Sequence, residues 1–368
     1  MAFDARTAAD PVAVRNEELG YPIVIGPGVL STIPDLVREG GGERNVILCD
    51  RNIEPYAHAI ARMLHGTLAV IPVHLGERRK TWETVGTVLE ELARSRADRS
   101  TLVIGVGGGV AGDAFGFAAS VFMRGVRFLN VATSLVAMVD AAIGGKTGVD
   151  LRAGKNLAGT FRDPIAVVCD TGLLATLPKE HLREGMAEVV KHAIIDGERA
   201  FGRLEALDGK PRAWPWESIV AESIGVKTRI VAGDPFESNT RALLNLGHTV
   251  GHAIERVSEY RVPHGRGVAI GLRAAGLMAQ SLGQFAAHDH RRILALLGRI
   301  KLPLCYEKLD GADIFAAMQM DKKRAGGEVR FVLPITIGRV EYGRAVPPDI
   351  VRAAIERCAH APAAEEVP

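Results

Sequence analysis

Short apolar runs alternate with amphipathic stretches along the first half of the chain. Five of the runs are almost continuously apolar: YPIVIG, NVILCD, LAVIPVHL, TLVIGVGGG and VRFLNVAT. Such runs are typical of strands that are buried on both faces of a parallel sheet. Between them, residues 29–39, 81–96 and 110–122 carry helical patterns. We therefore expect an α/β domain of the nucleotide-binding type with a mostly parallel sheet.

The pattern changes after AVVCD, which ends at Asp170. Strand-like runs nearly disappear until RFVLPITIG, and long helical patterns such as HLREGMAEVVKHAIIDG and RALLNLGHTVGHAIERVSEY fill the interval. The sequence thus predicts two domains, an α/β domain over residues 1–174 and a mainly α-helical domain over residues 175–368. The tail APAAEEVP reads as disordered.

Composition narrows the classes of partner. The 368 residues are enough for two domains of ordinary size, and 47% hydrophobic with 24% charged residues is a globular balance. A net charge of +2 gives no reason to expect nucleic acid or an anionic membrane as partner. The four cysteines lack CxxC spacing, and no signal peptide or membrane-length apolar run is visible, so a reducing cytoplasm is the expected setting.

A glycine-rich turn lies between an apolar run and a helical pattern. GVGGGVAGD extends from Gly105 to Asp113. Consecutive glycines let backbone amides approach an anion, and the start of a helix adds positive potential for a phosphate. Asp50, at the end of NVILCD, could meet a ribose hydroxyl. A tight turn without a ligand is the alternative interpretation.

The segment DAAIGGKTGVDLRAGKN, from Asp140 to Asn156, holds two lysines. We expect Lys146 and Lys155 to lie in glycine-rich loops, with Asn156 beside the second lysine. Compact cations on flexible backbone suit a phosphorylated ligand. Solvated lysines in surface turns are the alternative for this segment taken alone.

A third group of residues has the composition of a metal site. Glu188 and Lys191 are spaced i and i+3 in AEVVKH, His248, His252 and Glu255 follow one another in a helical pattern, and VPHGRG contains His264. One carboxylate and two imidazoles from separate segments would bind zinc and leave one coordination position open. HTVGH lacks the glutamate of HExxH, so a metalloprotease is not indicated, and polar residues on a helix surface remain the alternative.

Taken together, these motifs resemble the 3-dehydroquinate synthase family of sugar phosphate cyclases. The resemblance runs from YPIVIGPG to FVLPITIG through GGGVAGD, MRGVRF, VDAAIGGKTGV, GKNLAGTF, AEVVKH, RALLNLGHTVGHAIE and DKK. It implies that residues 1–174 bind NAD and that Glu188, His248 and His264 bind Zn²⁺, or Co²⁺ in its place.

The resemblance also implies a set of NAD and substrate contacts. The NAD contacts would be Asp50, Asn52, Glu77, Lys80, Gly107, Gly108, Gly109, Asp113, Thr133, Ser134 and Thr176. The substrate contacts would be Arg124, Asp140, Lys146, Lys155, Asn156, Lys191, Lys227, Arg241, Asn245, His252 and either Lys322 or Lys323.

The implied reaction converts 3-deoxy-arabino-heptulosonate 7-phosphate into 3-dehydroquinate and phosphate, with NAD regenerated in each turnover. The resemblance further implies a homodimer in which Arg124 acts across the interface. Aminodehydroquinate synthase, 2-deoxy-scyllo-inosose synthase and valiolone-type cyclases are close alternatives, and a metal-dependent alcohol dehydrogenase is a distant one. Arg241 and Lys227, the pair expected to hold a substrate carboxylate, favour dehydroquinate synthase over the inosose and valiolone cyclases.

Three positions depart from the family pattern. Arg266 stands where the family usually has glutamate, Asp150 where it has asparagine, and Met138 where glutamine is common. We expect these departures to bear on the exact substrate more than on the class of reaction.

Overall fold

The computed structural model describes residues 14–207, 211–325, 329–363 and 366, without the side chains of residues 212 and 321–325. These residues form two compact units. The first unit ends its main segment at Leu177 and regains Pro215–Ile224, and the second contains Pro178–Trp214 and the chain from Gly225 onward. The sequence predicts one boundary, after residue 174, and does not predict that Pro215–Ile224 belongs to the first unit.

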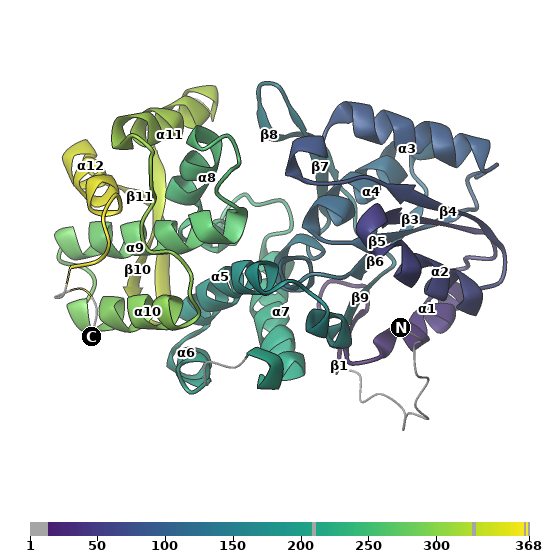
Figure 1. The fold of residues 1–368 in the computed structure, drawn as a ribbon, viewed down its shortest axis with the longest axis horizontal. Coiled ribbons are helices and arrows are strands. Elements are labelled where there is room, and N and C mark those ends of the chain that lie inside the picture. Colours follow the sequence, from purple (N-terminus) through teal and green to yellow (C-terminus); the bar gives the residue numbers. More distant parts are fainter. Residues whose placement is uncertain (1–13, 208–210, 326–328, 364–365, 367–368) are drawn as a thin grey trace. The chain divides into compact units, whose positions relative to one another are not determined.

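A twisted sheet organises the first unit. Among the described residues its seven strands follow the order β1-β2-β9-β6-β5-β3-β4 (Figure 1). β1 and β2 are antiparallel, and the other neighbours are parallel. The strands are β1 (Val14–Asn16), β2 (Ile23–Gly26), β3 (Asn45–Asp50), β4 (Thr67–Val73), β5 (Leu102–Gly107), β6 (Arg127–Ala132) and β9 (Ala166–Asp170). The predicted mostly parallel sheet is confirmed.

Helices cover both faces of this sheet, as the continuously apolar strands require. Figure 1 shows α1 and α2 on one side and α3 and α4 on the other. Leu36 and Ile60, from the first pair, pack with Ile47 and Ile104 of the strands. The helices are α1 (Ile33–Glu39), α2 (Glu54–Met63), α3 (Trp82–Arg94) and α4 (Gly109–Val121), with short 3-10 turns η1 (Val29–Thr32), η2 (Arg51–Ile53), η3 (Glu77–Arg79), η4 (Phe122–Arg124) and η6 (Thr171–Ala175) and a π-helical turn η5 (Ala137–Ala141).

The strand order changes direction between β3 and β5. After β3 the chain adds β4 on one side, and it then places β5 on the other side of β3. In open parallel sheets, ligands bind beyond the carboxyl ends of the strands at such a reversal. The carboxyl ends at this point are Asp50 and Gly107.

The glycine-rich segment around Lys146 and Lys155 folds as a hairpin. β7 (Lys146–Leu151) pairs antiparallel with β8 (Gly154–Phe161). The prediction that these two lysines lie in loops is therefore wrong. Gly148 and Gly159 face each other across the ladder at a separation that a side chain could not enter, so the glycines serve close strand pairing rather than loop flexibility.

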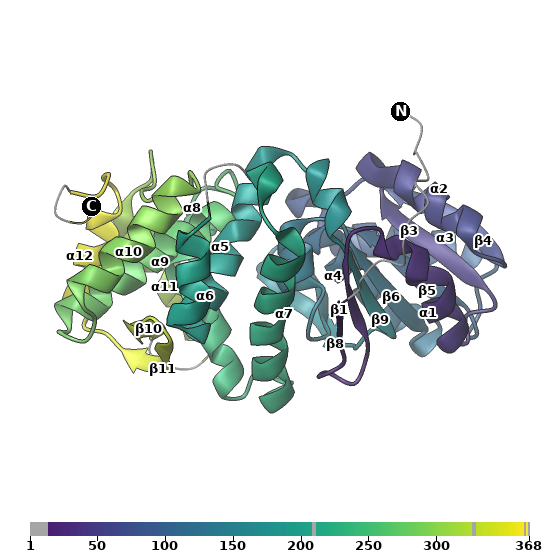
Figure 2. The ribbon, with the colours of Figure 1, turned by 90° about the horizontal axis from the view of Figure 1, so that it is seen from below.

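Helices make up most of the second unit, as the sequence predicts. Its helices are α5 (Lys179–Asp196), α6 (Glu198–Glu205), the later part of α7 (Trp216–Gly233), α8 (His248–Val257), α9 (His264–Ser281), α10 (Ala287–Arg299), α11 (Gly311–Ala325) and α12 (Pro348–Arg357), with 3-10 turns η7 (Pro211–Ala213) and η8 (Thr240–Asn245). β10 (Arg330–Thr336) and β11 (Arg339–Ala345) form an antiparallel pair, visible side by side in Figure 2.

The tail is not free of contacts where it is described. Glu366 pairs with the buried guanidinium of Arg273 on α9, with Nη2–Oε2 at 3.0 Å. The interpretation of this tail as disordered is wrong at Glu366, because a local composition of Ala, Pro and Glu carries no information about a cation buried elsewhere. Within the described residues, no helix is long and apolar enough to cross a membrane.

Candidate active site

Three helices of the second unit bring one carboxylate and two imidazoles together. Glu188 lies on α5, His248 begins α8 and His264 begins α9. Glu188 Oε1 is 3.1 Å from His264 Nε2 and 3.5 Å from His248 Nε2. Glu188 is fully buried, and the ring centroids of the two histidines are 5.3 Å apart. These are the three residues that the family resemblance implies as metal ligands.

Glycines permit the close packing that creates this cluster. A Cβ at Gly271 on α9 would overlap the carbonyl oxygen of Gly247, the residue before His248. A Cβ at Gly265, beside His264, would overlap the backbone of Glu184 on α5. Since only glycine lacks a Cβ, these positions allow α9 to approach both neighbours at backbone distance.

Hydrogen bonds orient both imidazoles toward Glu188. His248 Nδ1 lies 3.1 Å from the backbone oxygen of Leu246, and His264 Nδ1 lies 2.8 Å from Glu255 Oε1. A carbonyl oxygen and a carboxylate accept hydrogen bonds, so in the neutral imidazoles each Nδ1 carries the proton. Each Nε2 then presents its lone pair to the same point.

The charges of the cluster are strongly coupled. Burial would raise the pKa of Glu188, but Lys191 and the two histidines hold that pKa well below its usual range. Burial and the charge of Lys191 lower the pKa of His248 to about 3. Burial also opposes protonation of His264, but hydrogen bonds to Glu188 and Glu255 outweigh it and raise its pKa to about 10. Without a metal, the cluster therefore holds a proton on His264.

A zinc ion fits this donor set. The ligand atoms of Glu188, His248 and His264 all lie within 4.8 Å of one another. Ligand atoms about 2.1 Å from a tetrahedral ion are about 3.4 Å apart, close to the observed 3.1 and 3.5 Å. Two imidazoles with one carboxylate are a donor set of catalytic zinc sites, in which one coordination position stays open.

In the first unit, several predicted NAD residues gather at the carboxyl edge of the sheet. Asp50 ends β3 and accepts a hydrogen bond from the backbone of Asn52, at 3.1 Å. The oxygen of Gly107 accepts one from Thr133, at 2.9 Å. Gly108 precedes α4 and Gly109 begins it. A Cβ added at Gly108 would lie 3.2 Å from Ser134 Oγ. Thr176 Oγ1 lies 3.3 Å from Tyr56 Oη. Backbone amides at the start of α4 and a carboxylate at Asp50 suit a dinucleotide.

Lys80 joins the helix α4 to the β7–β8 hairpin. Its Nζ donates to Asp113 Oδ2 at 2.5 Å and to Asn156 Oδ1 at 2.6 Å. Burial would lower the pKa of Lys80, but the charge and hydrogen bond of Asp113 outweigh it and raise that pKa. Burial raises the pKa of Asp113, and Lys80 opposes this shift. One buried ammonium thus holds a predicted NAD residue and a predicted substrate residue together.

The remaining candidates of the first unit have distinct surroundings. Lys155 Nζ pairs with Glu77 Oε1 at 2.5 Å. Asp140 lies in the π-helical turn η5, a form that is frequent at functional sites. Lys146 is exposed at the start of β7, and Arg124 is exposed at the end of η4 with a φ of 67°.

In the second unit, the predicted substrate residues lie beside the metal cluster, around η8 and on α7. Lys191 is buried and pairs with Glu188, and the ring centroid of His252 is 5.1 Å from that of His248. Around η8, buried Arg241 donates to the oxygen of Pro235, and Asn245 donates to Glu237 Oε1 at 2.8 Å. Lys227, on α7, is buried. The side chains of Lys322 and Lys323 lie outside the described residues.

Sequence reasoning left two structurally prominent carboxylates unassigned. Glu255 lies two helical turns after His248, and this spacing could have assigned it to the same face as the predicted ligand. Asp234 accepts backbone hydrogen bonds from Ser238, Asn239 and Arg241. No sequence signal marks it, because these contacts exist only once the loop has closed.

Two departures from the family pattern also have definite contacts. Asp150 Oδ1 accepts from the backbone of Asn156 at 2.8 Å, and Arg266 Nε lies 3.9 Å from Glu184 Oε1. Asparagine could accept the first bond equally well, so Asp150 keeps that contact and adds a charge.

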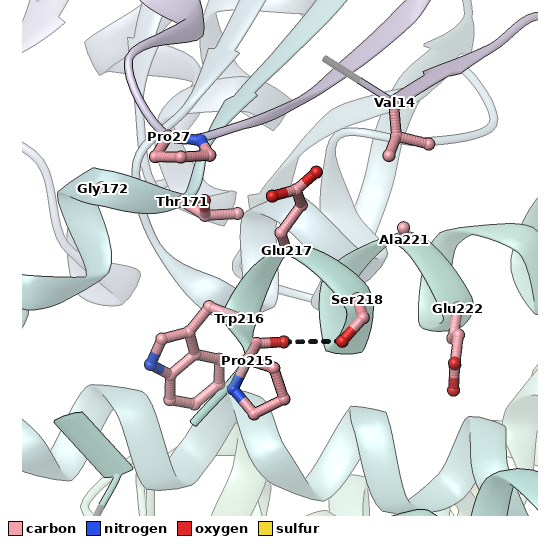
Figure 3. Close-up of a pocket in the computed structure, with 10 residues that line it drawn as sticks. All are labelled: Val14, Pro27, Thr171, Gly172, Pro215, Trp216, Glu217, Ser218, Ala221 and Glu222. Atoms are coloured by element: carbon pink, nitrogen blue, oxygen red, sulfur yellow. Dashed lines mark hydrogen bonds between the residues drawn. The ribbon is translucent and has the colours of Figure 1, made fainter. Parts of the chain in front are cut away.

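A cavity of about 620 Å³ lies in the first unit. Val14, Thr171, Trp216, Glu217 and Glu222 are among its lining residues, and Figure 3 shows the acidic side chains of Glu217 and Glu222 beside it. None of the predicted site residues lines it. The cavity is therefore not the predicted cofactor or metal site.

Comparison with known proteins agrees with the geometry. The family model described as 3-dehydroquinate synthase N-terminal matches residues 70–184, and the C-terminal model matches residues 185–324. The chain belongs to the 3-dehydroquinate synthase family. It is 39% identical to a 3-dehydroquinate synthase of Gloeobacter violaceus, over 94% of this chain and 98% of the relative. A 3-dehydroquinate synthase of Xanthomonas oryzae pv. oryzae is 40% identical, over 91% and 94% of the two chains. The predicted family is confirmed.

Solved structures of related cyclases share the fold. A 2-deoxy-scyllo-inosose synthase complexed with carbaglucose-6-phosphate, NAD⁺ and Co²⁺ matches with a TM-score of 0.82 and 25% identity, over 92% of this chain and 97% of that one. The 2-epi-5-epi-valiolone synthase of Streptomyces hygroscopicus, with NAD⁺ and Zn²⁺ bound, matches with a TM-score of 0.84 and 24% identity, over 98% and 99%. The predicted fold class is thereby confirmed.

Proposed function

We propose that this chain converts 3-deoxy-arabino-heptulosonate 7-phosphate into 3-dehydroquinate and phosphate, with NAD and Zn²⁺ as cofactors. The observation that carries the proposal is the convergence of Glu188, His248 and His264, within a chain about 40% identical to 3-dehydroquinate synthases over more than nine tenths of its length. Two related cyclases that contain NAD⁺ with Zn²⁺ or Co²⁺ support both cofactors.

The proposed NAD residues form the carboxyl edge of the sheet in the first unit. The start of α4 supplies backbone amides for the pyrophosphate, and Asp50 supplies an acceptor for a ribose hydroxyl. Lys80 holds Asp113 and Asn156 in place. When bound, NAD supplies a temporary hydride acceptor and the metal supplies positive charge beside the substrate oxygen that is oxidised.

The remaining roles follow from charge and burial. Lys191 keeps an ammonium next to Glu188, where it can stabilise negative charge that develops on the substrate. Arg241 and Lys227 are buried cations suited to the substrate carboxylate, since a carboxylate accepts two parallel hydrogen bonds from an arginine. By the family resemblance, Lys146, Asn156, Asn245 and His252 are each assigned contacts with the substrate, and their cationic and hydrogen-bonding side chains suit its phosphate.

One assay distinguishes this reaction from its alternatives. The chain is supplied with 3-deoxy-arabino-heptulosonate 7-phosphate, NAD and Zn²⁺, and phosphate, NADH and the carbocyclic product are measured. We expect one phosphate per 3-dehydroquinate and no net NADH. Stoichiometric NADH would indicate a dehydrogenase, and a preference for sedoheptulose 7-phosphate would indicate a valiolone-type cyclase.

The carboxylate contact can be tested separately. Replacing Arg241 with alanine should lower kcat/KM for the keto-acid substrate by at least a hundredfold, because two shielded charge-assisted hydrogen bonds contribute about 1.5–3 kcal/mol each. Arg339→Ala is a matched control, since Arg339 is an exposed arginine of β11 that pairs with Glu341 and belongs to no predicted site. Equal kcat/KM values for the two variants would contradict the role of Arg241.

We further propose that two copies of the chain associate and that Arg124 acts on the substrate phosphate of the partner. Met123 and Arg124 both have positive φ values, 51° and 67°, and both are exposed. Leu157 and Phe161 of β8 are about half exposed, at 52% and 51%. Among the described residues β8 pairs with β7 alone, so it is an edge strand of its sheet. Exposed apolar residues on an edge strand favour an interface here.

Subunit complementation tests this arrangement. Arg124→Ala and His264→Ala variants are mixed under conditions that exchange subunits. Random pairing makes about half of the dimers mixed, each with one intact site, so activity should recover to about a quarter of the wild-type value. If exchange is demonstrated by mass labels and activity stays absent, Arg124 does not act on the partner.

A further inference from the structure

Glu255 is buried next to a proposed metal ligand without belonging to the proposed ligand set. Its side chain is 2% exposed, and its Oε1 lies 2.8 Å from His264 Nδ1. The opposite nitrogen of the same ring, Nε2, lies 3.1 Å from Glu188 Oε1. One imidazole is thus held between two carboxylates, one at each nitrogen.

Local structure holds Glu255 in this position. Its backbone oxygen accepts hydrogen bonds from Tyr260 N at 2.7 Å and from Ser258 Oγ at 2.9 Å. Ser258 Oγ also accepts from Val262 N at 3.1 Å, which ties the turn that leads into His264. A Cβ at Gly267 would lie 3.3 Å from Glu255 Cγ, so the side chain runs along the first turn of α9. Both partners are therefore placed before any metal binds.

The chemistry of this contact selects one form of the ring. An ionised carboxylate only accepts hydrogen bonds, so the nitrogen that faces Glu255 must carry the proton. When a metal ion takes the place of the proton at Nε2, the lone pair that binds it is at Nε2, the nitrogen that faces Glu188 and His248. Carboxylates that accept from the far nitrogen of a metal-bound histidine fix its tautomer and raise its basicity.

The two proposed histidine ligands differ in this respect. His248 Nδ1 faces the neutral backbone oxygen of Leu246, whereas His264 Nδ1 faces a charge. With His264 neutral, as a metal ligand must be, Glu188, Glu255 and Lys191 together carry a charge of −1, and a divalent cation brings the total to +1. Removing the charge of Glu255 would leave the dication with less compensation in a buried site, where such charges matter most.

We propose that Glu255 is a positioning residue that fixes the tautomer and orientation of His264 and thereby sets the affinity of the site for its metal. The proposal rests on the proposed metal site. Within the second unit, a competing arrangement among the described residues is one in which His252, Glu255 and His264 themselves bind the ion, because their donor atoms also lie within 4.8 Å of one another. His252 is exposed, whereas His248 is buried, which favours the first arrangement for a shielded ion.

The test compares Glu255→Gln with the wild type in the full-length chain after metal removal. Zinc affinity is measured by competition with a chromogenic chelator, and the visible absorption spectrum of the Co²⁺ form reports the coordination of the metal. We expect one metal per chain, an affinity about 10–100-fold lower, and a shifted Co²⁺ spectrum. With metal saturating, KM for the substrate should stay within about twofold of the wild type, because the change acts through His264 alone.

Matched variants separate this effect from a loss of folding. Glu184→Gln is the control, since Glu184 also contacts a histidine, His181, at 3.2 Å, and belongs to neither proposed ligand set. Its zinc affinity should equal that of the wild type. Glu255→Asp retains the carboxylate and should recover part of the affinity, and it provides the same comparison if the amide variant unfolds.

Two outcomes would overturn the proposal. Wild-type zinc affinity together with an unchanged Co²⁺ spectrum in Glu255→Gln would show that Glu255 does not orient a ligand. Loss of all stoichiometric metal binding in that variant would make Glu255 a ligand itself. If the proposed ligands Glu188, His248 and His264 do not bind the metal, His264→Ala will keep the wild-type zinc affinity. This result distinguishes an error in the metal site from an error in the role of Glu255.

Discussion

Replacing Asp113 with asparagine tests how the buried ammonium of Lys80 is held. The Lys80 side chain is 6% exposed and that of Asp113 is 21% exposed. The ammonium has two observed partners, Asp113 Oδ2 and Asn156 Oδ1. In Asp113→Asn, two neutral amides would face a full charge that has little access to water.

The unequal burial of the pair predicts unequal effects. Removing one partner of a buried ion pair costs about 3–5 kcal/mol when the remaining charge stays buried. We expect about 3 kcal/mol for Asp113→Asn, because Asn156 still accepts one hydrogen bond. Lys80→Met should cost about 1–2 kcal/mol, since the carboxylate that it leaves behind is partly exposed and can be hydrated.

Urea unfolding of both variants, followed by circular dichroism, measures these free energies. For a unit of this size, 1 kcal/mol shifts the thermal unfolding midpoint by about 2–4 °C. On heating, Asp113→Asn should therefore unfold roughly 6–12 °C below the wild type. Burial would lower the pKa of the unpaired Lys80 in the folded variant below its unfolded value of about 10.4. At pH values between the folded and the unfolded pKa of Lys80, the unfolded state binds more protons than the folded state, so the free energy of unfolding of the variant rises with pH. Its deficit should therefore shrink from pH 7 to pH 9.5.

The opposite order of effects would refute this reasoning. If Lys80→Met destabilises the chain as much as Asp113→Asn, the exposure of the remaining partner does not control the cost. A deficit of Asp113→Asn that is unchanged up to pH 9.5 would show that no unpaired ammonium remains buried.

Three further changes test the packing and charges of the second unit. Gly271→Ala should cost at least about 3 kcal/mol and weaken zinc binding, because its Cβ would overlap the backbone of Gly247, the residue before α8. Gly202→Ala, with open space around it, should be neutral or slightly stabilising in the same urea titration. Glu366→Gln should cost roughly 2–4 kcal/mol, because Arg273 is 1% exposed, and an additional Arg273→Met should recover part of that loss in a double-mutant cycle. Burial lowers the pKa of His290 to about 4 in the folded chain, so the unfolded state binds more protons between pH 6.5 and pH 4. The free energy of unfolding therefore falls as the pH falls through this range, by up to roughly 3 kcal/mol. His290→Gln should remove this pH dependence when unfolding is compared at pH 7 and pH 5.

Local patterns were sufficient for most elements of the fold. NVILCD and AVVCD are strands with the predicted ends, Asp50 and Asp170, and the helix predicted over residues 110–122 is α4 (Gly109–Val121). These elements are continuously apolar or strongly periodic, and burial against a sheet imposes such patterns directly. The β7–β8 hairpin was not predicted, because its glycine-rich sequence resembles a flexible loop, whereas in the structure the glycines allow the two strands to pair closely.

The residue types of the candidate site were also readable from the sequence. Glu188 with Lys191 and His248 with His252 have helical spacings, and their motifs were enough to indicate the family. Spacing along one helix, however, says nothing about which residues of other helices come near. The meeting of α5, α8 and α9 depends on glycine contacts between segments that are far apart in the chain.

The partners of each charge arose from tertiary packing alone. Glu255 could be assigned to the face of His248, but its pairing with His264 Nδ1 depends on the turn between α8 and α9. Lys80 was expected to touch a cofactor, and its contacts with Asp113 and Asn156 join segments 33 and 76 positions away. A hydrogen bond needs its two atoms about 3 Å apart, whereas sequence patterns specify only which face of an element is buried. The residue types therefore indicated the chemistry of the site from the sequence alone. Which side chains pair with one another was decided only by the folded chain.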